Sequence, residues 1–205
     1  MDLQIWLAYV LTAIVFSLAP GSGTVNSVSN GISHGMKKSL PAIAGLQIGL
    51  MIHIAFVGAG IGALVAQSAT AFTIIKWVGV AYLIWLGINK WRDSSSLSVS
   101  EAGDEKSGLQ LLRSAVVINL TNPKSIVFLV ALFPQFIDPT ATQLPQLMIL
   151  GVTTVVIDTV VMLFYTGLAS QLGRFIRSEA MMARLNKVFG SMFVGCGLLL
   201  ATARA

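Results

Sequence analysis

The sequence predicts an all-α membrane protein of six transmembrane helices, arranged as two inverted three-helix repeats. Of its 205 residues, 55% are hydrophobic and only 10% are charged, whereas soluble domains are about 25% charged. Roughly 20 apolar residues span a bilayer, so the chain has room for about six spans. A polar, proline-containing interruption occurs once in each half, as expected of a transporter built from two repeats with its site at the breaks.

The first interruption lies inside the first apolar run, as SLAPGSGTVN over residues 17–26. Pro20 cannot continue a helical hydrogen-bond ladder, and Gly21 and Gly23 remove side-chain constraint. Free amides after the break would form a positive helix N-terminus suited to a carboxylate. The alternative is a plain proline kink with glycines for close packing. Polar side chains that packing does not need favour a binding site here: Ser22, Thr24 and Asn26.

The first half is expected to contain three helices. Helix 1 should run from about residue 5 through the Pro20 break towards residue 30, and residues 31–39 should form a loop. The next 37 residues, 39–75, carry no formal charge and are too long for one helix. They are expected to contain helix 2 over about 40–66 and the start of helix 3, which runs over about 69–89.

The second half repeats this pattern after a hydrophilic linker. Residues 90–108 are rich in Ser and mixed charge, which is typical of a flexible connection. Helix 4 is expected over about 112–136 with a break at Pro123, helix 5 over about 145–171 and helix 6 over about 187–203. The chain is therefore predicted to be one transporter domain over 1–205, with repeat 1 over about 1–89 and repeat 2 over about 109–205.

Basic residues predict the orientation. Ten of the 13 Lys and Arg residues fall in or beside the loops after helices 1, 3 and 5, and none falls in the loops after helices 2 and 4. The positive-inside rule places the basic loops in the cytoplasm and both termini in the periplasm. This distribution also explains the net charge of +5 without a nucleic-acid partner. The ten are Lys37, Lys38, Lys90, Arg92, Lys106, Arg113, Arg174, Arg177, Arg184 and Lys187.

Matching features support the duplication. Pro123 follows Pro20 by 103 residues, and Asp158 follows His53 by 105 residues. The motif KWVG likewise returns as KVFG 111 residues later. Three similar offsets in chain order indicate a duplicated three-helix unit. Because each unit has an odd number of helices, the two copies are expected to be inverted relative to each other.

Asp158 lies between apolar residues on both sides, in TTVVIDTVVMLFY. A carboxylate in hydrocarbon is costly and should face a cavity or a cation. Asp158 could carry a proton or bind a substrate ammonium, and the structural alternative is an ion pair, for instance with Lys124. Ionisable residues within a membrane usually have a functional role. Asp158 is therefore predicted to bind substrate and to couple transport to protons.

Further candidate side chains lie at the second break and on helix 2. Lys124 is near mid-membrane, where it could hold a substrate carboxylate or neutralise Asp158. Its neighbours Asn119 and Asn122 could bind substrate or satisfy carbonyls that the proline frees. On helix 2, Gln47 is a candidate for substrate binding. His53, six residues later, is either a proton-coupling group or a hydrogen-bonded residue between helices.

Other chemistries have no matching motif. Two histidines and one cysteine at unrelated positions predict no metal site. The sequence has no Walker loop and no dinucleotide fingerprint, so neither a nucleotide cofactor nor direct ATP drive is expected.

Four stretches resemble the LysE/RhtB amino-acid exporters. They are PGSGTVN after helix 1, AGLQIGL at 44–50, KWVGVAYLIWLGI at 76–88 and NLTNPKSIVFLVALFPQF at 119–136. The resemblance implies a bacterial inner-membrane exporter of small amino acids that uses proton antiport and no cofactor. Within the family the likeness is greatest to exporters of homoserine and its lactone, with threonine as a further substrate. Many relatives read Pro-Gly-Pro where this chain has Pro20-Gly21-Ser22, and the extra hydroxyl could contact a hydroxylated substrate.

Other functions stay open at this point. The chain could export another neutral amino acid, or act as an importer or a passive channel, because the direction of transport cannot be read from the residues. A remote alternative is an intramembrane serine hydrolase with Ser22 as nucleophile and His53 as base, although the repeats have no role in that chemistry. The protein is therefore not expected to be an enzyme. Its glycine-rich faces would serve packing within the chain or a homodimer equally well.

Overall fold

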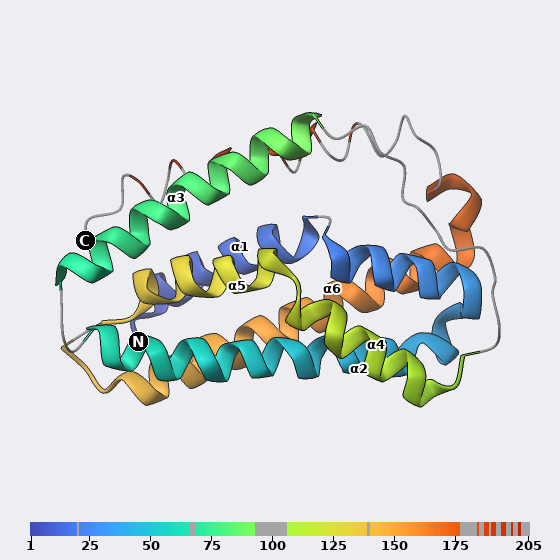
Figure 1. Cartoon of the computed structure of the whole chain (residues 1–205), viewed down its shortest axis with the longest axis horizontal. Coiled ribbons are helices and arrows are strands. Elements are labelled where there is room, and N and C mark those ends of the chain that lie inside the picture. Colours follow the sequence, from blue (N-terminus) through green and yellow to red (C-terminus); the bar gives the residue numbers. More distant parts are fainter. Residues whose placement is uncertain are drawn as a thin grey trace.

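The computed structural model describes residues 1–19, 21–65, 69–92, 106–138 and 140–176, together with isolated positions between 184 and 201. All regular structure in these residues is helical (Figure 1). Three predicted features lie wholly or largely outside them: Pro20, most of the linker over 90–108, and most of helix 6 over 187–203.

The first predicted break is present. Helix α1 (Leu3–Leu18) begins after Asp2, whose carboxylate accepts a hydrogen bond from the Gln4 amide at 2.7 Å and so caps the helix. The helix ends before Ala19, which is extended with φ −65° and ψ 130°. A new helix, α2 (Ser22–Val65), begins three residues later. The chain therefore leaves helical geometry where the Pro-Gly sequence predicts it.

The loop predicted over residues 31–39 was wrong. Helix α2 continues through this region and is interrupted by a single residue, Gly35, with φ 74° and ψ 174°. Figure 1 shows the short first part of α2 and its long second part meeting at this turn. A side chain is essentially excluded from this backbone conformation, so glycine alone changes the direction of the chain where nine loop residues were expected.

Substitution of Gly35 by Ala tests this turn. A Cβ at Gly35 would meet no described atom within 4 Å, so the expected loss of about 1–3 kcal/mol comes from backbone strain. Thermal unfolding in detergent should show a lower Tm. A Cβ at helical Gly60 also meets nothing within 4 Å among the described residues, which makes Gly60→Ala the matched control. Equal Tm values for both variants would contradict the assignment.

The second predicted break is confirmed. Helix α4 (Gly108–Leu120) begins four residues before the predicted position, because Ser107 and Gln110 form a capping box. Helix α5 (Pro123–Leu132) follows at an angle of 51° and continues as the 3₁₀ helix η1 (Phe133–Phe136). Proline is the first residue of α5, a position where its missing N–H costs nothing.

The two remaining helices match their predicted positions within a few residues. Helix α3 (Ala69–Arg92) ends three residues later than expected, and α6 (Gln143–Ile176) ends five residues later.

The two halves cross the molecule in opposite directions. Helix α2 packs against α4 and α6, while α3 packs against α5 (Figure 1). The path through α1 and the first part of α2 runs opposite to the path through α4 and α5. The first part of α2 and the start of α4 lie at one end, and the N-terminus and the start of α6 lie at the other. Aromatic contacts join α1 to α5, where the rings of Phe16 and Phe128 stack 3.7 Å apart.

The outer surface suits a membrane. Two described helices, Ser22–Gly60 and Gln143–Gln171, are long and apolar enough to cross one, and the bent α4–α5 pair makes a third candidate. Along α6, large apolar side chains are exposed at every fourth residue, so they form a continuous apolar stripe that winds around the helix. These residues are Leu144, Met148, Val152, Val156, Val160 and Phe164. The chain is therefore a helical protein embedded in a membrane.

Candidate functional site

The two helix breaks meet near the middle of the molecule, although they lie about 100 residues apart in sequence. Lys124, the second residue of α5, donates a hydrogen bond from Nζ to the Ala19 carbonyl at 2.5 Å. The same ammonium lies 4.4 Å from the centre of the Phe16 ring, within the range of a cation–π contact. The Ala19 carbonyl lies just beyond the last residue of α1, so a side chain from the second half caps a helix end in the first.

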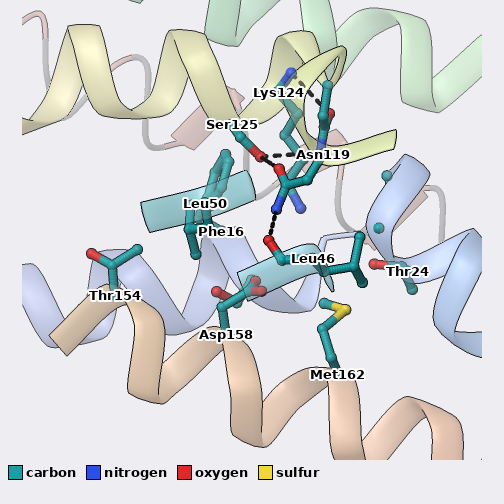
Figure 2. Close-up of a pocket in the computed structure, with 14 residues that line it drawn as sticks. Phe16, Thr24, Leu46, Leu50, Asn119, Lys124, Ser125, Thr154, Asp158 and Met162 are labelled. Carbon is teal, nitrogen blue, oxygen red and sulfur yellow. Dashed lines mark hydrogen bonds between the residues drawn. The ribbon is translucent and has the colours of Figure 1, made fainter. Parts of the chain in front are cut away.

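A cavity opens beside this contact (Figure 2). It lies between the two breaks, the middle of α2 and one face of α6. Its lining combines one acid, one amine and several hydroxyl and amide groups with apolar side chains and glycines. The polar residues are Ser17, Thr24, Asn119, Asn122, Lys124, Ser125, Thr154 and Asp158, and the others are Phe16, Gly21, Gly23, Leu46, Leu50 and Met162.

The cavity is small. The space left for the centre of a water-sized sphere is about 30 Å³, and a single water needs roughly 10–15 Å³ by this measure. One or two waters therefore fit, whereas an amino acid does not. Binding of a solute as large as an amino acid requires side chains or helices to move apart.

Asp158 forms the acidic wall of the cavity. Its Oδ2 accepts a hydrogen bond from Gln47 Nε2 at 2.9 Å, and the Ser17 side chain bonds the same carboxylate. Gln47 lies on α2 and Ser17 on the last turn of α1, so three elements converge on this one group. Asp158 is half-buried and borders the cavity, which leaves the carboxylate facing the space that a cation would occupy.

The predicted asparagines hold the second break together. Asn122 caps α5 by accepting a hydrogen bond from the Lys124 amide at 3.1 Å, and its Nδ2 donates to Ser125 Oγ. Ser125 donates in turn to Asn119 Oδ1, and Asn119 Nδ2 donates to the Leu46 carbonyl on α2. This chain of bonds fixes the geometry of the break and still leaves both asparagines on the cavity wall.

His53 lies away from the cavity lining, at the end of α4. Its Nε2 is 3.2 Å from the Leu120 carbonyl. Because a carbonyl only accepts hydrogen bonds, Nε2 carries the proton that His53 donates. Leu120 is the last residue of α4, so His53 caps the helix end at the second break as Lys124 caps the one at the first.

The remaining predicted residues divide into two groups. Gly21 and Gly23 line the cavity, and a Cβ at Gly21 would lie 3.0 Å from Lys124 Cδ. Ser22 is exposed and is not part of the lining. Asn26 also lies outside the lining, where its Oδ1 accepts a hydrogen bond from Asn30. Pro20 lies outside the described residues.

Several lining residues were missed by sequence reasoning. Thr154 lies one helical turn before Asp158, so helical spacing alone places it on the same face. Ser17 and Ser125 flank the two breaks, and their polarity inside apolar runs was the available signal. In the part of the chain that the structure describes, no three His, Cys, Asp or Glu side chains gather as a metal site would require.

Comparison with known proteins identifies the family. A model of the LysE type translocator matches residues 14–204. The chain belongs to the LysE family. A LysE-family chain is an amino-acid efflux transporter, so this protein is a transporter and not an enzyme. The exposed Ser22 agrees with this conclusion, because it lies outside the cavity lining and His53 is bonded to Leu120.

Relatives of this LysE-family protein align with it over almost its whole length. An uncharacterized membrane protein of Vibrio cholerae serotype O1 is 68% identical over 205 residues, all of both chains. The homoserine/homoserine lactone efflux protein of Salmonella typhimurium is 50% identical over 204 residues, which are 100% of this chain and 99% of that protein. A leucine efflux protein of an Enterobacter species is 33% identical over 203 residues, which are 98% and 96% of the two chains. No solved structure matches.

Proposed function

We propose that this transporter exports homoserine and homoserine lactone from the cytoplasm in exchange for protons. The observation that carries the proposal is the position of Asp158, an acid that borders a small cavity between two helix breaks. The similarity to the homoserine/homoserine lactone efflux protein, at 50% identity over the full chain, supports the choice of substrate.

The two compounds share an ammonium group, but only homoserine has a carboxylate. An anchor common to both must therefore be anionic, and Asp158 is the only acid in the described lining of the cavity. The carboxylate of homoserine has its own complement in the Lys124 ammonium and the N-terminus of α5. Neither group is needed for the lactone. This division explains how one site accepts both compounds.

Proton exchange follows from the cost of a bare carboxylate within a membrane. When the substrate ammonium leaves, only the more distant Lys124 ammonium still attracts the Asp158 carboxylate, and protonation removes the remaining cost of the charge. A proton and a substrate ammonium thus compete for one group, which is sufficient for antiport. The bond to Leu120 gives His53 a positioning role at the break in this scheme. The proton gradient is the energy source, and no cofactor is involved.

We also propose six spans in the bacterial inner membrane, built as two inverted repeats in a single domain over 1–205. The opposite directions of the two broken helices support the inversion. The basic loops are assigned to the cytoplasm and both termini to the periplasm. Threonine is a further proposed substrate, because it too combines an ammonium with a side-chain hydroxyl. A homodimer stays a prediction.

Efflux from energised cells tests the function. Cells that overproduce the protein are loaded with labelled homoserine, and its loss is followed with and without a protonophore. Faster loss than in cells without the protein, abolished by the protonophore, is expected. Equal retention with and without the protein would overturn the choice of substrate. Loss that ignores the protonophore would indicate a passive channel. Labelled leucine in parallel tests the substrate suggested by the leucine efflux relative.

A further inference from the structure

Thr24 has a buried hydroxyl with no hydrogen-bond partner among the residues that the structure describes. Its side chain is only 4% exposed and lines the cavity. Within the described residues, Thr24 Oγ1 is the only hydroxyl among the buried polar atoms that lack a partner. Figure 2 shows it across the pocket from Thr154, with Leu46 and Met162 between Thr24 and Asp158. Buried polar groups are rarely left unsatisfied in native proteins, so this one requires an explanation.

The helix break explains why the hydroxyl is free. Other threonines satisfy Oγ1 by donating to a carbonyl one helical turn earlier, as Thr154 does to Leu150 and Thr159 does to Val155. Thr24 is the third residue of α2, so no residue of α2 lies one turn before it. The break therefore leaves a hydroxyl donor at the cavity wall.

We propose that Thr24 is the specificity-determining contact for the side-chain oxygen of the substrate. Within the proposed function, on which this inference rests, the ammonium binds Asp158. Met162 lies one turn further along α6 and on the side of the pocket towards Thr24 (Figure 2). The aliphatic carbons of the substrate then pack on Met162 and Leu46, and the oxygen at the γ-carbon reaches the Thr24 hydroxyl.

The chemistry of the two substrates fits one donor. The homoserine hydroxyl and the lactone ring oxygen occupy the same position in the carbon skeleton, and both accept a hydrogen bond. An apolar side chain of the same length, as in norvaline, would leave the Thr24 hydroxyl unpaired. A site built to bond an oxygen discriminates against an analogue that lacks it. The site should therefore select small amino acids that carry a side-chain oxygen.

Transport in inside-out vesicles tests the assignment. Uptake of labelled homoserine and labelled norvaline is measured at equal concentrations for the wild type, Thr24→Val and Thr24→Ser. Valine keeps the shape of threonine and removes the hydroxyl, whereas serine keeps the hydroxyl. The wild type should prefer homoserine. In Thr24→Val, the ratio of homoserine to norvaline uptake should fall about tenfold, as expected for one lost hydrogen bond. Thr24→Ser should retain most of the wild-type ratio.

Three results would overturn the proposal and are distinguishable. If the wild type transports homoserine and the uptake ratio is unchanged in Thr24→Val, the Thr24 hydroxyl does not bind the side-chain oxygen of the substrate. If Thr24→Val loses uptake of both compounds equally, its role is structural. If the wild type transports no homoserine, the proposed function fails and the inference fails with it. Norvaline uptake by Thr24→Val shows that this variant is folded.

Discussion

Replacement of Asp158 by Asn should abolish export of both homoserine and homoserine lactone. The amide is nearly isosteric and can still pair with Gln47 and Ser17, but it cannot bind an ammonium as an ion pair or carry the exchanged proton. Removal of one partner of a buried charge pair costs about 3–5 kcal/mol, which corresponds to a loss of at least about a hundredfold. Initial efflux rates of the two labelled compounds, measured at equal protein levels in the membrane, test this expectation.

Asp138 provides the matched control. It is exposed in the loop between η1 and α6, and hydrogen bonds from the Thr140 hydroxyl and amide lower the pKa of its carboxyl. Asp138 is therefore ionised under the assay conditions, and Asp138→Asn removes the same unit of charge outside the cavity. Its export should equal that of the wild type. Wild-type export of either compound by Asp158→Asn would refute Asp158 as the common anchor.

Gly45→Ala should be the most destabilising of the single-methyl additions considered. A Cβ at Gly45 would lie 2.2 Å from the Leu112 carbonyl oxygen and 2.9 Å from the Ala115 Cβ, so α2 and α4 would have to move apart. Overpacking of this kind costs about 1–3 kcal/mol or more. The opposing atom at Leu112 belongs to the backbone and cannot be relieved by a side-chain rotation. Chemical or thermal unfolding in detergent should therefore show a marked loss of stability.

Gly167→Ala is the control for helix propensity. A Cβ there meets nothing within 4 Å among the described residues, and alanine favours a helix over glycine by about 1 kcal/mol. The two substitutions should therefore shift stability in opposite directions. An equal or greater stability of Gly45→Ala would show that α2 and α4 do not pack as closely as described.

The sequence predicted the features whose cause is local. A proline lacks the N–H that continues a helix, so both breaks could be located without knowledge of tertiary structure. The cost of a charge in hydrocarbon similarly drew attention to Asp158 and Lys124, and both line the cavity. The turn at Gly35 was mispredicted as a loop because GISHGMKKS is polar and glycine-rich. Nothing in that composition reveals that one residue with positive φ is sufficient.

Side-chain direction could not be predicted from the break alone. Ser22 and Thr24 are two residues apart, which places them on nearly opposite sides of a helix. The hydroxyl expected to meet the substrate was that of Ser22, yet Ser22 is exposed and Thr24 lines the cavity. The choice between them depends on how α2 is rotated after the break. The hydrogen-bond partner of His53 could not be predicted either, because Leu120 is 67 residues away in sequence.

The small volume of the cavity bears on backflow. A carrier that has released its cargo outside must reset, and any solute caught during that reset travels inwards and wastes the previous cycle. With about 30 Å³ for water-sized occupants, the cavity holds one or two waters and has no room for an amino acid. A reset through a form with so small a cavity would carry almost no solute. Net extrusion, rather than a swap of internal for external amino acids, is the behaviour that such a narrow form favours.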